Sequence, residues 1–267
     1  MFDKMYSMKQ AEEEKLDNPT TSDKPIIGIC FDWRRDPEDR TYAYIPSVMR
    51  DYRNAISAAG GELFVLSFDD NINDYKNQLD GYIIPGGRDI HPKFYGADIK
   101  GSVVSDVADI HFNFNRSVYN NLPAACPLLG ICWGFQFLNV VNGGTMIQHM
   151  HDTDHHYAKR KFKVDPDNWI YRASKGTVKG NCYHHQALDK LGENVYVTAI
   201  DDFSKTAHAL EVKEPGRDIT GILWHPEITF RNESRDARED CSLNILGGFV
   251  EKCAQYKRKK QVYTRQN

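Results

Sequence analysis

The segment Pro127-Leu128-Leu129-Gly130-Ile131-Cys132-Trp133-Gly134-Phe135-Gln136 decides the fold. Its first half is a short apolar run of the kind found in fully buried strands, and a helical pattern begins directly after it. Glycines on both sides of Cys132 permit a tight turn from strand to helix, and such a turn exposes the side chain at its apex. We therefore predict a strand–turn–helix unit that presents Cys132 at a helix N-terminus.

Cys132 is the first candidate catalytic residue. The helix dipole and the free N–H groups at a helix N-terminus favour a thiolate, which is the nucleophilic form of cysteine. A cysteine in an apolar run is more often a buried packing residue. The sequence offers no packing reason for the two flanking glycines, and this favours the nucleophile.

Strand and helix patterns alternate on both sides of this segment. Apolar runs at 25–31, 63–66, 81–84 and 127–131 predict strands, with helices at 45–59, 109–122 and 133–141. This alternation is typical of an α/β fold with a parallel sheet covered on both faces. Short β-like runs follow at 157–167, 195–199, 207–212 and 219–224, and a last helix is expected at 243–256.

The composition fits one soluble globular unit. The chain has 267 residues, 40% of them hydrophobic and 27% charged, which excludes collagen-like and wholly disordered classes. We predict a flexible segment at 1–23, one domain at 24–256 and a basic tail at 257–267. No apolar run reaches about 18 residues and no secretory signal begins the chain, so neither a membrane nor export is expected. Six cysteines without a CxxC pair favour reduced thiols and a cytoplasmic location.

The charge is unevenly distributed. The net charge is −3, yet six basic residues and no acidic residue follow Glu251. An acidic body with a short basic tail is not the footprint of a nucleic-acid-binding protein. We interpret Lys257-Arg258-Lys259-Lys260 as the solvated cationic end of a helix, with a targeting or acidic-partner patch as the alternative.

His225 is the best placed general base among ten histidines. It follows the apolar run that ends in Trp224, where a strand end can present a side chain to a cleft. Glu227 lies two residues further, across Pro226, where its carboxylate can orient an imidazole. The spacing alone leaves an incidental strand-end histidine equally open.

The motifs around Cys132 and His225 together resemble the class I glutamine amidotransferase superfamily. The segments Ile84-Pro85-Gly86-Gly87-Arg88-Asp89-Ile90-His91-Pro92, 138–145 and Tyr183-His184-His185-Gln186-Ala187 resemble, more narrowly, its γ-glutamyl hydrolase branch. Within that branch the similarity is greatest to γ-glutamyl-γ-aminobutyrate hydrolases. It extends over about residues 24–252, with the motifs in the family's order.

This resemblance implies a flavodoxin-like core and a Cys132–His225–Glu227 triad. It also implies that the backbone N–H groups of Gly87 and Trp133 form an oxyanion hole. By the same resemblance, five residues hold the glutamyl moiety: Gln136, Tyr183, His184, His185 and Gln186. From the residues alone, these would be a helix-face amide and a polar loop. The reaction requires neither a metal nor another cofactor. A small γ-glutamyl compound is the expected partner, and a homodimer is compatible with the sequence.

Three positions depart from the branch. Trp133 stands where arginine is common, Asp109-Ile110-His111 where an Arg-Asp pair is usual, and His208 where a glutamate is usual. These departures leave the amine side of the substrate open.

A histidine-rich segment is the remaining candidate site. His149, His151, His155 and His156 lie close to Asp152 and Asp154. Imidazoles and carboxylates are metal ligands, but no recognised metal spacing occurs here, so we favour a loop near the active-site cleft.

Three functions follow as hypotheses. The first is hydrolysis of γ-glutamyl amides through a γ-glutamyl thioester. The second is a glutaminase subunit that supplies ammonia to a partner synthetase. The third is a catalytically silent binding protein on the same fold.

Overall fold

The computed structural model describes residues 18–19, 22–31, 45–150, 156–174, 176, 178–231 and 241–266. The expected flexibility of the N-terminal segment falls mostly on residues outside these ranges. The same holds for His151, Asp152, Asp154 and His155 of the histidine-rich segment.

Strands and helices alternate through the first half of the described chain, as the sequence predicts. The strands are β1 (Ile26–Cys30), β2 (Glu62–Leu66), β3 (Gly81–Ile84), β4 (Leu128–Ile131), β5 (Met146–Ile147), β6 (His156–Val164), β7 (Val178–Tyr183), β8 (Ala187–Leu188), β9 (Val195–Asp201), β10 (Ala207–Val212) and β11 (Ile219–Ile222). The helices are α2 (Ile45–Ala58), α3 (Ile72–Tyr75), η2 (Pro92–Tyr95), α4 (Ala108–Asn121), α5 (Trp133–Val141), α6 (Trp169–Ala173), η4 (Pro226–Arg231) and α7 (Ser242–Gln266).

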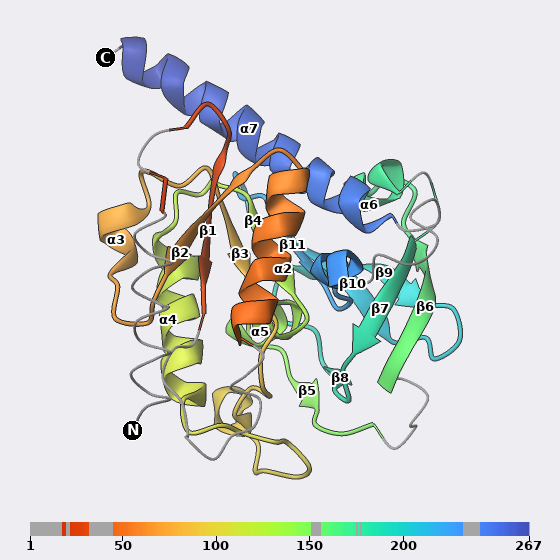
Figure 1. Ribbon diagram of the computed structural model, residues 1–267. Coiled ribbons are helices and arrows are strands. Elements are labelled where there is room, and N and C mark those ends of the chain that lie inside the picture. Colours follow the sequence, from red (N-terminus) through yellow and green to blue (C-terminus); the bar gives the residue numbers. More distant parts are fainter. Residues whose placement is uncertain are drawn as a thin grey trace.

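The main sheet combines a parallel block and an antiparallel block. Its nine strands have the order β2-β1-β3-β4-β11-β10-β9-β6-β7, which Figure 1 shows from β2 to the β6–β7 pair. The neighbouring strands from β2 to β11 pair in parallel, whereas those from β11 to β7 pair antiparallel. The parallel block has the 2-1-3-4-5 order of flavodoxin-like folds, which confirms the predicted fold class.

Both faces of the sheet are buried at β1. Ile27 and Ile29 of β1 pack into one apolar cluster with residues of α2 and α7. Ile26 and Cys30, which alternate with them, pack into a second cluster with residues of α4 and α5. This alternation explains why β1 is an uninterrupted apolar run in the sequence. Within the described residues, no helix combines the length and apolarity that a membrane span needs.

Several elements differ from the sequence prediction. The short helices α3 and α6 and the strand β7 were not expected, because each is too short or too polar to show a clear period. The predicted strand at 157–167 ends at Val164. The last helix, predicted to end near Tyr256, continues to Gln266.

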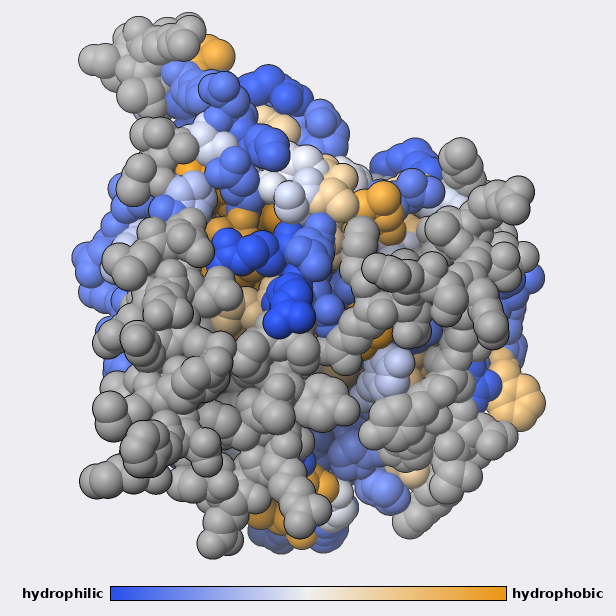
Figure 2. Space-filling view, viewed as in Figure 1, coloured by the Kyte–Doolittle hydropathy of each residue, from blue (hydrophilic) through white to orange (hydrophobic). Residues whose placement is uncertain are grey.

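The sequence predicts that Lys257-Arg258-Lys259-Lys260 is a solvated helix end, but the structure places two of these lysines beside a buried carboxylate. Lys260 Nζ lies 2.7 Å from Asp80 Oδ1, and Lys257 Nζ lies 3.5 Å from Asp80 Oδ2. Asp80 is only 2% exposed, and its Oδ2 also accepts a hydrogen bond from the N–H of Ile26. Most of the α7 surface that can be seen along the top of Figure 2 is hydrophilic. The two lysines therefore attach the end of α7 to the start of β1 and β3.

Truncation after Tyr256 is expected to destabilise the protein. It removes both lysines and leaves the buried Asp80 carboxylate without its cations, which should lower the free energy of unfolding by roughly 3 kcal/mol. The matched control is truncation after Lys260, which retains both ion pairs. Urea denaturation of the two truncated proteins tests this, and equal stability of the two would contradict it.

Candidate active site

Three strand ends meet at one edge of the parallel block. Cys132 follows β4, Gly86 and Gly87 follow β3, and His225 lies three residues beyond β11. Register pairs Gly130 of β4 with Ile84 on one side and with Gly221 on the other, so the three segments leave the sheet together. The carboxyl ends of parallel strands are where ligands bind in folds of this kind.

Cys132 has an unusual backbone conformation. Its φ is 51° and its ψ is −98°, one of three positive φ values at non-glycine residues in the described chain. The turn is held by two hydrogen bonds: Cys132 N–H donates to Ile222 O at 2.8 Å, and Gln136 N–H donates to Cys132 O at 3.1 Å. A strained residue of this kind costs about 1–3 kcal/mol and is often found at functional sites. The predicted strand–turn–helix unit is therefore present, but the expected exposure of the side chain is wrong, because Cys132 is only 7% exposed.

The flanking glycines have a packing reason that the sequence did not reveal. A Cβ on Gly134 would lie 2.2 Å from Ile84 O, and one on Gly130 would lie 2.6 Å from the Gly134 backbone. Both glycines thus allow α5 to start directly against β3 and β4. They are explained by close packing of the turn, and by themselves they are no evidence for a nucleophile.

Replacing Gly134 with alanine is expected to destabilise the fold by about 3 kcal/mol, because the new Cβ meets backbone that cannot move independently. Gly247 in α7 is the matched control, since nothing lies within 4 Å of a Cβ built there. Gly247→Ala should stabilise by about 1 kcal/mol through helix propensity. Urea unfolding measures both variants, and similar values for the two would contradict the close-packing account.

His225 and Glu227 form a hydrogen-bonded pair. His225 Nδ1 lies 2.7 Å from Glu227 Oε1, with the side chains 12% and 2% exposed. Burial lowers the pKa of His225, but the Glu227 carboxylate and Cys132 raise it more strongly, so the net pKa lies well above its usual value. The Cys132 thiol is close enough to the ring to contribute to this shift. The three predicted triad residues therefore lie together.

The loop after β3 lies against this group. A Cβ on Gly86 would lie 2.9 Å from His225 Cε1 and 3.6 Å from Cys132 Cβ, so only glycine fits between these side chains without displacement. Gly86 N–H donates to Tyr52 Oη at 3.4 Å. Burial, followed by the nearby Glu227 carboxylate, raises the pKa of Tyr52 well above its usual value. Tyr52 therefore stays neutral beside the site.

Gly87 and Trp133, the predicted oxyanion-hole residues, are neighbours. A Cβ on Gly87 would lie 3.5 Å from Trp133 Cγ and 2.9 Å from His111 Cε1. The His111 ring stacks on Trp133 with a centroid distance of 3.7 Å. Burial lowers the pKa of His111 to about 3, so this imidazole is neutral at pH 7.

The residues predicted to hold a glutamyl group have different surroundings. Gln136, His184 and Gln186 are buried, with exposures of 4%, 4% and 1%. Tyr183 is 40% exposed, and its ring meets that of His225 edge-on at 5.6 Å. The fifth residue, His185, is paired with Asp89.

His185 belongs to a polar chain. Its Nε2 lies 3.0 Å from Asp89 Oδ1, and its Nδ1 lies 3.0 Å from His149 Nδ1. His149 is therefore next to the predicted substrate-binding segment, as the loop interpretation of the histidine-rich segment expects. Burial raises the pKa of Asp89, although the Val103 N–H and His185 oppose this shift.

The segments that carry these residues match a known family. Residues 25–227 match the family model described as Peptidase C26. The chain belongs to the Peptidase C26 family.

Similar proteins include glutamine amidotransferase-like chains. A protein of Rickettsia prowazekii, provisionally named as glutamine amidotransferase-like, is 30% identical over 77% of this chain and 92% of its own length. One subunit of a glutamine-hydrolyzing GMP synthase from Picrophilus torridus is 24% identical over 67% of this chain and 80% of its own length. A crystal structure from Thermoplasma acidophilum, provisionally described as the corresponding GMP synthase subunit, matches with a TM-score of 0.62. The match covers 89% of this chain and 98% of that one, and its 16% identity shows the fold alone.

Membership of Peptidase C26, together with glutamine amidotransferase-like relatives, supports a cysteine hydrolase-type function.

Sequence reasoning missed Tyr52, and it noted His111 only as a departure from the branch. Tyr52 lies inside the helix predicted at 45–59, and the sequence has no signal for its contact with the loop after β3. His111 reaches the site only because α4 packs beside the start of α5. Neither contact has a local sequence pattern that could predict it.

Proposed function

We propose that this Peptidase C26 chain hydrolyses γ-glutamyl amides and releases glutamate and an amine. The observation that carries the proposal is the grouping of Cys132, at a strained turn, with the hydrogen-bonded His225–Glu227 pair at the carboxyl edge of the sheet. A nucleophile, a base and a group that orients the base are the components of covalent amide hydrolysis.

In the first half-reaction, the Cys132 thiolate attacks the γ-carbonyl carbon and a C–S bond forms. The carbonyl oxygen becomes an oxyanion, which the N–H groups of Gly87 and Trp133 stabilise. The tetrahedral intermediate then collapses. The C–N bond breaks as the His225 imidazolium donates its proton to the departing amine, which leaves a γ-glutamyl thioester on Cys132.

In the second half-reaction, neutral His225 removes a proton from water, and the hydroxide attacks the thioester carbon. The C–S bond breaks, glutamate leaves and the thiolate–imidazolium pair is restored. Glu227 fixes the orientation of the His225 ring through both steps and stabilises its positive charge. Its carboxylate is 2% exposed, so water competes little for this role.

The amine side of the substrate would lie near the residues that depart from the branch. Trp133 and His111 form a stacked, uncharged pair next to Gly87, and Trp133 is only 2% exposed. The pair therefore supplies no positive charge beside Gly87 for a carboxylate on the amine.

A screen of γ-glutamyl conjugates tests the proposal. The purified protein is incubated with conjugates of polyamines, amino acids, aminobutyrate and folate, and released glutamate is measured. We expect at least one conjugate to be hydrolysed in the absence of any partner protein. Failure of every conjugate, with a folded protein, would overturn the proposal.

A second candidate is a glutaminase subunit that delivers ammonia to a partner synthetase. It is favoured by the similarity to a protein named as one subunit of a glutamine-hydrolyzing GMP synthase. Free glutamine separates the two candidates, because a glutaminase subunit would hydrolyse glutamine in preference to the conjugates. A homodimer and a cytoplasmic location stay predictions.

A further inference from the structure

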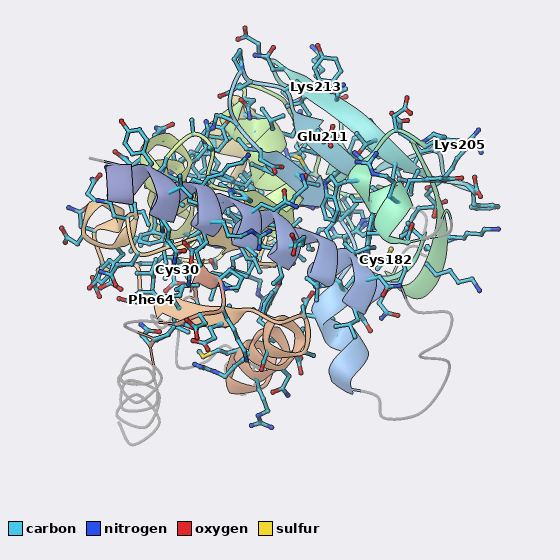
Figure 3. All side chains as sticks on the ribbon, turned by 90° about the horizontal axis from the view of Figure 1, so that it is seen from above. Cys30, Phe64, Cys182, Lys205, Glu211 and Lys213 are labelled. Carbon is cyan, nitrogen blue, oxygen red and sulfur yellow. The ribbon has the colours of Figure 1, made fainter. Side chains whose placement is uncertain are left out.

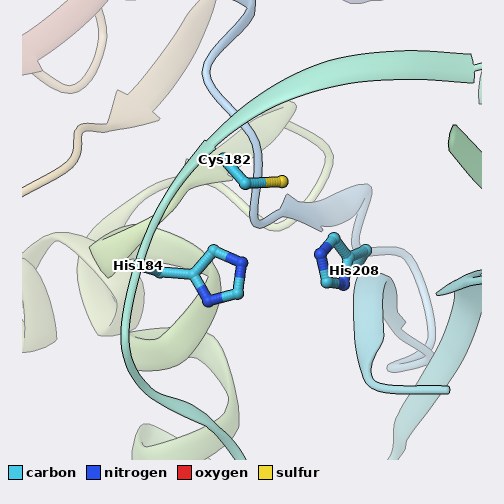
Figure 4. Close-up of side chains that lie close together, drawn as sticks. All are labelled: Cys182, His184 and His208. Atoms are coloured by element: carbon cyan, nitrogen blue, oxygen red, sulfur yellow. The ribbon is translucent and has the colours of Figure 1, made fainter. Parts of the chain in front are cut away.

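A second group of reactive side chains lies in the antiparallel block. Cys182 is on β7, His184 follows that strand, and His208 is on β10. One potential ligand atom from each residue lies within 4.8 Å of those of the other two. The exposures are 0%, 4% and 0%. Figure 4 shows the Cys182 sulfur pointing into the space between the two imidazole rings.

Backbone oxygens orient both rings. His184 Nδ1 lies 3.0 Å from Gln186 O, and His208 Nδ1 lies 3.3 Å from Thr206 O. A carbonyl oxygen only accepts hydrogen bonds, so both contacts favour the tautomer in which Nδ1 carries the proton and Nε2 keeps its lone pair. The Thr206 hydroxyl also lies 3.4 Å from His208 Nδ1. Imidazoles that bind metals in proteins are commonly held in this way, with the second nitrogen donating to a carbonyl or a carboxylate.

A buried carboxylate near the three side chains suits a cation. Asp201 is 1% exposed and lies close enough to His208 and Cys182 to influence the ionisation of both sites. A thiolate and two neutral imidazoles would leave one positive charge on a bound divalent ion, which the Asp201 carboxylate balances. Burial and the Asp201 carboxylate raise the pKa of Cys182 to about 12, and Arg160 opposes this only in part, so the thiol loses its proton only when a metal binds the sulfur.

We propose that Cys182, His184 and His208 form a binding site for a divalent metal ion of the zinc class. One thiolate and two imidazoles are a ligand set that Zn²⁺ accepts in tetrahedral geometry, with one position left for another ligand. Metal–ligand bonds of about 2.0–2.3 Å require the three donor atoms to draw together by roughly 1 Å. Cys182 releases its thiol proton to solvent as the metal–sulfur bond forms.

The site would brace the segment that carries His225. His225 N–H donates to Asn181 O, beside Cys182, at 3.0 Å, and Leu223 N–H donates to His208 O at 2.8 Å. A metal that joins β7 to β10 would therefore hold both strands that contact the end of β11. Figure 3 shows Cys182 well separated from Cys30 of β1, at the other end of the sheet.

The sequence did not indicate this site. Its ligands span residues 182–208 without a recognised metal spacing. The segment at 149–156 was the metal candidate in the sequence because its histidines lie close together along the chain. In the part of the chain that the structure describes, Cys182, His184 and His208 are the one group of three such side chains that converge in this way.

Cobalt binding by the full chain tests the proposal. The protein is stripped of metal with a chelator and titrated with Co²⁺, whose thiolate charge-transfer and tetrahedral d–d absorption bands report a cysteine-containing site. We expect saturation at one ion per chain and displacement by Zn²⁺. Zn²⁺ should also raise the melting temperature of the wild type.

Variants identify the ligands. Cys182→Ala should abolish the charge-transfer band, and His208→Gln should weaken binding by more than the roughly 10–100-fold that loss of an outer-shell partner costs. Cys253→Ala is the matched control, because Cys253 is an equally buried thiol at 0% exposure. Cys132→Ala tests whether the absorption band comes instead from Cys132 and His225 of the candidate active site. Circular dichroism confirms that each variant is folded.

The band should persist in Cys253→Ala and Cys132→Ala. Absence of a band in the wild type, or its persistence in both Cys182→Ala and His208→Gln, would overturn the proposal. The γ-glutamyl conjugate screen is a separate measurement, so failure of one proposal does not imply failure of the other.

Discussion

Replacing Cys132 with alanine is expected to reduce turnover of a γ-glutamyl amide by at least roughly 10⁴-fold. The substitution removes the only atom that can form the thioester, and loss of a nucleophile leaves only the rate enhancement from binding and from the oxyanion hole. Released glutamate measures the effect, with the best conjugate from the screen as substrate. Retained activity in this variant would contradict the proposed mechanism.

Two controls make this result specific. Cys253→Ala removes another buried thiol and should leave turnover within about twofold, since Cys253 lies in the core next to Gly81. A diazoketone analogue of glutamine should label the wild type but not Cys132→Ser. Labelling of the wild type would also exclude the catalytically silent binding protein, because alkylation requires a thiolate aligned with a glutamyl site.

Replacing Glu227 with glutamine is expected to lower kcat by roughly 10²–10⁴-fold. The amide keeps the shape of the side chain but removes the charge that orients and stabilises the His225 imidazolium. With the carboxylate absent, burial becomes the dominant influence and the pKa of His225 falls. NMR titration of the His225 ring measures this fall, and an unchanged titration would contradict the assigned pairing.

The His225–Glu227 pair makes the stability of the folded protein fall as the pH rises. Because the pKa of His225 in the folded protein is raised above its usual 6.5, the stabilisation it provides is complete below about pH 6.5. It is lost as the pH rises through the raised value. The stability difference between wild type and Glu227→Gln should therefore shrink at alkaline pH. Glu251→Gln serves as the control, since Glu251 is exposed on α7 and should show little change.

The parallel block and the turn that carries Cys132 could be predicted from sequence because both depend on local patterns. Each buried strand is a continuous apolar run, and Cys132, His225 and Glu227 stand at strand ends that a parallel sheet brings to one edge. Their grouping as a triad was implied by the resemblance to the amidotransferase superfamily, because the spacing around His225 alone left its role open.

The remaining site features depend on packing between distant segments. Tyr52 reaches the loop after β3 from α2, and His111 stacks on Trp133 from α4. Neither contact follows from spacing along the chain. The packing role of Gly134 was missed for the same reason, since it depends on how closely α5 approaches β3.

The attachment of α7 to Asp80 has a consequence for the order in which the molecule can be completed. Lys260 also donates to Leu79 O, across a separation of 181 residues. Asp80 lies where β1 and β3 begin, so the parallel block contains a carboxylate whose cations are synthesised about 180 residues later. An N-terminal fragment that contains β1, β2 and β3 would therefore lack full stability, and the nascent chain would depend on late contacts to close its core.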